Sequence, residues 1–143
     1  DDLCGGDYVY NAVLAANEVV NPKMQATLDA AELSALQKAG QITDCEIDGP
    51  IAFDGAISVQ AAHHKGMTNP NAGKADILIM PNIEAGNILF KSITYFSKNK
   101  ITNIICKTKT PIILTSRSDS DEAKYNSILL AILMAQTQGA AHV

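Results

Sequence analysis

Hydrophobic and polar residues follow two patterns along the chain, and together they predict alternating strands and helices. Short apolar runs rich in β-branched residues predict strands within residues 8–16 and at residues 43–47, 76–80, 101–106 and 111–115. Apolar positions at helical spacing predict helices at residues 30–39, 58–65, 84–98 and 120–136. Strands that alternate with helices across short connections favour a mostly parallel sheet with helices on both faces. The expected fold class is therefore α/β, in a three-layer αβα arrangement.

Residues that start and stop helices support several of these limits. Asp29 and Glu32 have the spacing of a capping box before the first helix, and Gly40 stands where a C′ glycine is expected. Asp54 or Ser58 is expected to cap the second helix.

The most apolar segments are expected in the interior. The strands at residues 76–80 and 111–115 contain continuous apolar runs, which are typical of strands covered on both faces, so we expect both in the centre of the sheet. The helix segment 128–135 is apolar on all sides. It is expected either to be a central buried helix or to pack against another chain.

Length and composition indicate one folded domain. The chain has 143 residues, of which 47% are hydrophobic and 18% charged, and this excludes a disordered protein. Residues 8–143 are expected to form a single α/β domain, and residues 1–7 a leader or a truncation scar. The net charge is −4 with no basic stripe, so no nucleic-acid partner is expected.

A membrane span and a disulfide framework are not expected either. The longest apolar run is the eight residues 128–135, whereas a span needs about 20. Cys4, Cys45 and Cys106 are far apart and have neither CxxC nor zinc spacing, which favours a reduced, cytoplasmic protein.

The clearest candidate site is the run Thr115-Ser116-Arg117-Ser118-Asp119-Ser120, which follows an apolar strand and precedes a helix. Hydroxyls, the chain's only arginine and a helix N-terminus together favour an anion site. Arginine gives phosphate a two-pronged hydrogen-bonded fork. The alternative is a capped helix start, with Ser118–Asp121 or Asp119–Glu122 as the capping box.

Other strand ends carry weaker signals. Residues 81–87 include Glu84, Gly86 and Asn87 in a strand-to-helix turn, which could bind a ligand or simply start a helix, and they contain no dinucleotide fingerprint. Asp48-Gly49-Pro50 is expected as a turn after a strand. His63-His64-Lys65 favours a solvated helix end over a metal site, because adjacent residues point to different helix faces. Cys106 is expected in the core, and no metal site is predicted.

Four spaced motifs occur in order along the chain: D-G-P-I-A-F-D-G-A-I-S at 48–58, A-A-H-H-K-G at 61–66, A-G-K-A-D-I-L-I-M-P-N-I-E-A-G-N-I-L-F-K at 72–91 and P-I-I-L-T-S-R-S-D-S at 111–120. Together they resemble the phosphate acetyltransferase/phosphate butyryltransferase family, and the butyryl branch is the more similar. The resemblance covers about residues 11–135 and corresponds to the C-terminal half of family chains. Those chains have two α/β domains of the isocitrate/isopropylmalate dehydrogenase-like fold, with the active site in the cleft between them.

The resemblance implies reversible acyl transfer between coenzyme A and phosphate, with acyl-CoA, phosphate and acyl phosphate as partners and no tightly bound cofactor. It implies that Arg117 binds phosphate, that Ser116 donates a hydrogen bond to the transition state and that Lys91 lies at the same cleft. It also implies substrate-binding roles at the strand ends: Glu84, Gly86, Asn87, Thr115 and the D-G-P-x-x-x-D residues Asp48, Gly49, Pro50 and Asp54. Because two helix N-termini would then converge, phosphate is expected near Arg117, Ser116 and the Gly86-Asn87 turn.

One position departs from the family pattern. The aspartate proposed as the base in acetyltransferases lies six residues after the arginine, where this chain has Ala123. Asp119 is therefore the preferred base, ahead of Asp121 and Glu122.

Two alternatives to a homo-oligomeric acyltransferase stay open. The chain could be an inactive fragment or binding half that needs the family's N-terminal domain. It could instead be another enzyme of the same fold, such as an NAD- and metal-dependent dehydrogenase, which would need clustered aspartates and a nucleotide motif.

Overall fold

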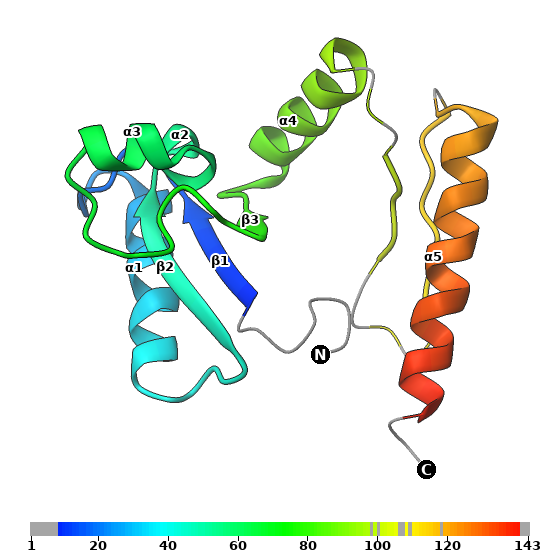
Figure 1. Cartoon of the computed structure of the whole chain (residues 1–143), viewed down its shortest axis with the longest axis horizontal. Helices are drawn as coiled ribbons and strands as arrows, with labels where there is room; N and C mark the ends of the chain where they lie inside the picture. Colours follow the sequence, from blue (N-terminus) through cyan, green and yellow to red (C-terminus); the bar gives the residue numbers. More distant parts are fainter. Residues whose placement is uncertain are drawn as a thin grey trace. The chain divides into compact units, whose positions relative to one another are not determined.

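The computed structural model describes residues 9–97, 99, 101–105, 108, 110–117 and 119–140. The chain divides into two compact units, the first ending at Leu89 and the second beginning at Phe90. Unit 1 contains, in chain order, β1 (Val9–Leu14), α1 (Gln25–Lys38), β2 (Cys45–Ile51), α2 (Phe53–Ile57), α3 (Val59–His64), β3 (Ile77–Ile79) and the first part of α4 (Ile83–Phe96) (Figure 1). Unit 2 contains the second part of α4 and the whole of α5 (Asp121–Ala140). The expected leader, residues 1–7, lies outside the described residues.

Unit 1 is built on a three-stranded parallel sheet in the order β2-β1-β3. The parallel pairing confirms the α/β class. The expected centre of the sheet is wrong, because β1 is central and the DILIM segment supplies β3, a three-residue edge strand with Ile77 47% exposed. In the described chain β3 pairs with β1 alone, so an apolar run was not sufficient to place a strand in the centre.

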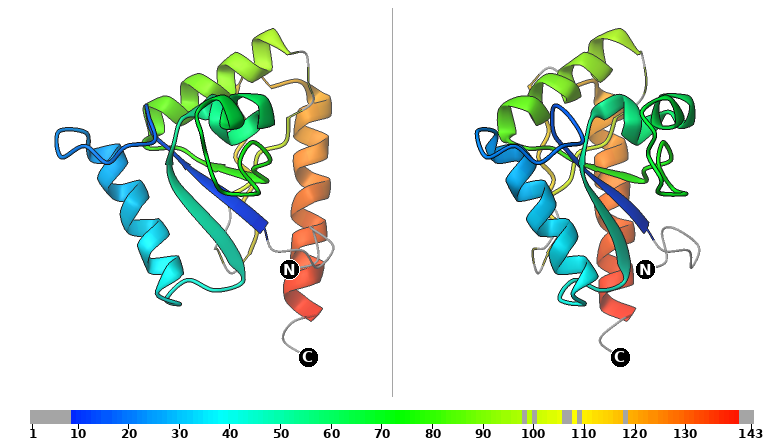
Figure 2. Two further views of the ribbon diagram at one scale, coloured as in Figure 1. Left: turned by 60° about the vertical axis from the view of Figure 1, so that its left-hand side comes forward. Right: turned by 90° about the vertical axis from the view of Figure 1, so that its left-hand side faces the viewer.

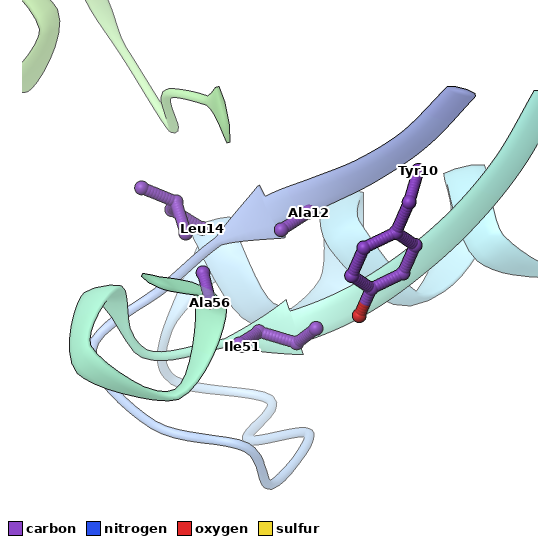
Figure 3. Packing of buried hydrophobic residues seen from close by; sticks show 5 residues of the cluster. All are labelled: Tyr10, Ala12, Leu14, Ile51 and Ala56. Atoms are coloured by element: carbon purple, nitrogen blue, oxygen red, sulfur yellow. The ribbon is translucent and has the colours of Figure 1, made fainter. Parts of the chain in front are cut away.

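Both faces of the sheet are covered, as the alternation of side chains along β1 requires. Tyr10, Ala12 and Leu14 pack with Ile51 and Ala56 on one face (Figure 3). Val13, on the other face, packs with Ile47 and with Ala30 of α1. Figure 2 shows α1 running alongside β2. Helices on the two faces thus enclose the sheet.

Asp48-Gly49-Pro50 does not form the expected turn but continues β2 to Ile51. The register moves from Ala12↔Asp48 to Leu14↔Ile51, which is a bulge at the glycine and proline. Proline is tolerated there because β2 is an edge strand. Glycine is required by packing, since a Cβ at Gly49 would lie 2.9 Å from the Val13 Cβ and 3.2 Å from the Ala30 Cβ.

Two of the predicted helix-boundary signals are confirmed and one is wrong. Gly40 follows α1 with φ +72°, and the Ser58 Oγ accepts a hydrogen bond from the Ala61 N–H at the start of α3, so both expectations are confirmed. The Asp29 capping box is wrong, because α1 begins one turn earlier, after Met24. There Gln25 Nε2 donates to Asp29 Oδ1 within the helix. The short helix α2 was not predicted.

The expected strands at 101–106 and 111–115 are wrong for the described residues of unit 2. Only one isolated antiparallel bridge, Ile105 to Ile112, joins these segments. β-Branched runs favour strands, but a strand also needs a hydrogen-bonded neighbour, and no further pairing is formed here among the described residues. Cys106 lies outside them.

Helix α5 is only partly buried. Ser127 and Ala131 are buried, whereas Ile128, Leu129, Ile132 and Leu133 are 42–55% exposed, so the helix is not a central buried one. Packing against another chain stays a prediction. Among the described helices, α5 included, none has the length and apolarity needed to cross a membrane.

Candidate functional site

Three of the four predicted catalytic side chains meet in unit 2. Lys91 Nζ, on α4, donates to Ser116 Oγ at 3.1 Å, and the Ser116 N–H donates to Asp119 Oδ2 at 2.7 Å. The Asp119 N–H donates back to the Ser116 carbonyl at 3.1 Å, which closes a tight turn around position 117. A cation, a hydroxyl and a carboxylate are thus linked within one turn and the helix beside it.

Asn103 belongs to the same network, and the sequence did not single it out. Its Nδ2 donates to Asp119 Oδ2 at 3.2 Å. Its backbone N–H donates to the Oγ of the buried Ser127 at 3.0 Å. Asn103 and Asp119 are 16 residues apart, so no local motif could have joined them.

Arg117 and Thr115 lie in the same turn with exposed side chains. The Arg117 guanidinium makes no hydrogen bond or ion pair to another described residue. The cap of α5 is Ser120, whose Oγ accepts from the Ala123 N–H at 3.1 Å. The Asp119–Glu122 capping box is therefore wrong, because the Asp119 carboxylate turns back to Ser116, and the Ser118 alternative lies outside the described residues.

Glu84, Gly86 and Asn87 are in unit 1, at the start of α4 rather than in a turn. Asn82 caps the helix, with its Oδ1 accepting from the Ala85 N–H at 2.9 Å. Because the helix begins at Ile83, Gly86 is already helical, and a Cβ there would meet Met80 only at ordinary contact distance. Convergence of this helix start with the Arg117 turn stays a prediction.

Asp48 lies on β2 and binds a neighbouring loop. Asn69 Nδ2 donates to both Asp48 Oδ2 and Glu46 Oε1 at 2.9 Å, and Asn71 Nδ2 donates to Glu46 Oε2 at 2.7 Å. Burial, followed by the charges of Asp48 and Glu46, raises the pKa of Tyr10, whose hydroxyl lies 3.5 Å from Asp48 Oδ2. A polar groove of about 350 Å³ lies beside these residues, between the end of α1 and the loop at Thr68–Pro70. In this structure Asp48 and Pro50 act as parts of β2.

Asp54 takes a different partner from Asp48. Lys65 Nζ lies 2.6 Å from Asp54 Oδ1 and 2.8 Å from Glu18 Oε1. The hydrogen bond from Lys65 lowers the pKa of both carboxyls, and its bonds to Asp54 and then Glu18 raise the pKa of the Lys65 amine. His63 and His64 are exposed, as expected of a helix end. The sequence did not predict that Lys65 would form ion pairs with both Glu18 and Asp54.

No three His, Cys, Asp or Glu side chains are grouped to hold a metal ion within the part of the chain that the structure describes. Cys45 is a half-buried free thiol.

Comparison with protein families decides the relationship. Residues 5–132 match the family described as Phosphate acetyl/butaryl transferase. The chain belongs to this family. Relatives include the phosphate butyryltransferases of Clostridium beijerinckii, 54% identical over 92% of this chain, and Clostridium acetobutylicum, 55% identical over 87%. The phosphate acetyltransferase of Thermotoga maritima is 51% identical over 87%.

The family member described here spans less than half the length of these relatives, 44%, 41% and 42% respectively. Among solved structures, the branched-chain phosphotransacylase from Enterococcus faecalis V583 superposes with a TM-score of 0.79 at 40% identity, over 90% of this chain and 46% of that one. These matches confirm the resemblance found in the sequence. They do not favour the dehydrogenase alternative.

Proposed function

We propose that this chain supplies the phosphate-binding and proton-transfer groups of a phosphate acyltransferase. The enzyme would move an acetyl or butyryl group reversibly between coenzyme A and phosphate. The observation that carries the proposal is the hydrogen-bonded grouping of Lys91, Ser116 and Asp119 in a member of the family.

In the proposed reaction, the thiol of coenzyme A attacks the carbonyl carbon of an acyl phosphate. Asp119 accepts the thiol proton at Oδ1, since Oδ2 is taken by two hydrogen bonds. The carbon–sulfur bond forms, and Ser116 and Lys91 stabilise the negative charge on the carbonyl oxygen.

The intermediate then collapses as the bond from carbon to the phosphate oxygen breaks. The electron pair leaves on phosphate, which Arg117 binds through its two-pronged guanidinium. Asp119 returns its proton to the phosphate, so that the products are acyl-CoA and hydrogen phosphate. The reverse reaction uses the same groups in the opposite order.

The expectations about partners, cofactors, location and oligomeric state are part of this proposal. Acyl-CoA, phosphate and acyl phosphate are the partners, with no tightly bound cofactor, no nucleic acid and no membrane. A cytoplasmic homo-oligomer is proposed, and the half-exposed apolar residues of α5 support an interface with another chain.

The test is an acyl-transfer assay that follows thiol release from butyryl-CoA and acetyl-CoA with phosphate. Two proteins are compared: this chain, and the Clostridium beijerinckii relative in which the matching segment is replaced by this chain. The 54% identity of the two segments favours folding of the replacement. We expect the replaced-segment enzyme to transfer acyl groups. A folded but inactive replacement would contradict the proposal and favour the inactive binding half.

A further inference from the structure

The Asp119 carboxylate is held asymmetrically. Oδ2 accepts both the Ser116 N–H at 2.7 Å and the Asn103 Nδ2 at 3.2 Å. Oδ1 accepts no hydrogen bond from the described residues. One oxygen is therefore fixed while the other stays open to a reactant.

The backbone of Asn103 is held by a hydrogen bond, so that its side chain can hold Asp119 in turn. Its backbone N–H donates to Ser127 Oγ, and Ser127, 1% exposed, donates in turn to the Ala123 carbonyl at 2.8 Å. Its main chain is thus tied to the interior side of α5. An amide held in this way offers Asp119 a neutral donor at a constant position.

We propose that Asn103 is a positioning residue for acyl transfer: it holds Asp119 Oδ2 so that Oδ1 accepts the thiol proton. This inference rests on the proposed function. An aspartate at position 103 would replace the donor by a second carboxylate and repel Asp119, and an alanine would leave Oδ2 with the Ser116 N–H alone.

The direct test measures hydrogen exchange of the Ser116 backbone amide by NMR in the 143-residue chain. The variants are N103A, N103D and D119N. In D119N the amide oxygen can take the place of Oδ2 and accept from both Ser116 and Asn103, while the amide nitrogen takes the place of Oδ1. Thr102, exposed and without a hydrogen bond to any described residue, supplies the control T102A.

We expect Ser116 exchange to rise about tenfold in N103A and further in N103D, because a hydrogen bond to a charged group is lost. Exchange should rise less in D119N than in N103D, because both hydrogen bonds to position 119 are kept although the acceptor is neutral, and it should stay unchanged in T102A. Circular dichroism checks that each variant is folded. Unchanged Ser116 exchange in folded N103A and N103D would overturn the positioning role.

Kinetics of the replaced-segment enzyme separate positioning from folding. N103A should lower kcat about tenfold and leave the KM for phosphate within about twofold, because phosphate contacts are kept. D119N should be inactive although its hydrogen bonds to Ser116 and Asn103 are kept, since an amide at 119 cannot accept the thiol proton. Acyl transfer by D119N at the wild-type rate would overturn the inference.

Failure of the proposed function would give a different result from failure of the positioning role of Asn103. A wild-type replaced-segment enzyme without acyl transfer would contradict that function, while faster Ser116 exchange in N103A would still support the Asn103–Asp119 coupling.

Discussion

The two units of this chain are stabilised by different kinds of contact. Of the twelve buried hydrophobic residues in the described part of the chain, eleven lie in unit 1 and one, Ala131, lies in unit 2. Unit 2 instead has a chain of hydrogen bonds from Lys91 through Ser116 and Asp119 to Asn103 and Ser127. The scaffold and the candidate chemistry are thus largely separated along the sequence.

This difference shows that apolar burial determines the structure of unit 1 and that polar contacts determine the structure of the turn in unit 2. In unit 1, side chains alternate between two covered faces of a sheet, and apolar burial drives that arrangement. In unit 2, Leu114 is 64% exposed and Ile112 47% exposed, so the turn at 116–119 depends on its hydrogen bonds. Mutations should therefore affect stability in unit 1 and activity in unit 2.

The largest stability loss is expected from Gly73→Ala in unit 1. Gly73 has φ +81°, and a Cβ there would lie 2.3 Å from the Val59 backbone nitrogen, which cannot rotate aside. The free energy of unfolding should fall by about 3–5 kcal/mol, or the chain should fail to fold. Urea denaturation followed by circular dichroism measures the change.

Gly40→Ala is the matched control. Gly40 has a similar φ of +72° but no atom within 4 Å of a Cβ, so only the left-handed backbone cost of about 1–2 kcal/mol applies. Equal losses in the two variants would show that the close packing of Gly73 against Val59 does not contribute to stability.

Truncation of apolar side chains should distinguish the units next. Ile51→Ala removes a 2% exposed side chain from the core and should cost about 3 kcal/mol. Leu114→Ala, in unit 2, should change the free energy of unfolding by less than about 0.5 kcal/mol. Denaturant melts of both variants provide the measurement. A Leu114→Ala loss as large as that of Ile51→Ala would remove the contrast between the units.

The smallest effect is expected from the exposed ion pairs of Lys65. The bond from Lys65 lowers the pKa of Glu18 below its ordinary 4.5, so this stabilisation is present above pH 4.5 and is lost as the pH falls through the lowered value. Lys65→Met should therefore be slightly less stable than wild type at neutral pH and equal to it in strong acid. Denaturant melts across this pH range measure the difference. A gap that persists or widens in acid would contradict the assignment.

The sequence predicted the parts of the fold that depend on local signals. The strand within 8–16, the Gly40 stop and the Ser58 cap are confirmed, because each follows from side chains near in sequence. The D-G-P turn was wrong because an edge strand can absorb proline in a bulge. The strands at 101–106 and 111–115 were wrong because pairing partners cannot be read from a β-branched run.

The candidate site shows the same limit. Motif positions identified Lys91 and Ser116, and Asp119 was chosen from the nearby carboxylates because the family's position for the base holds Ala123. The structure joins all three by hydrogen bonds. Asn103, and the link of Lys65 to Glu18 across 47 residues, depend on tertiary contacts that no spacing signals. Roles for Gly86, Asn87, Thr115, Asp48 and Asp54 in binding substrate stay predictions.

The central claim is that the turn at 115–119 binds the phosphate of the acyl phosphate, and Arg117 tests it most directly. The measurement is acyl transfer by the replaced-segment enzyme carrying Arg117→Ala or Arg117→Lys, with acyl phosphate and coenzyme A varied separately. Loss of a charge-assisted pair of about 1.5–3 kcal/mol predicts roughly a 10- to 150-fold fall in kcat/KM for acyl phosphate, only partly restored by lysine. An unchanged rate in Arg117→Ala would make Arg117 an ordinary surface residue and contradict the site.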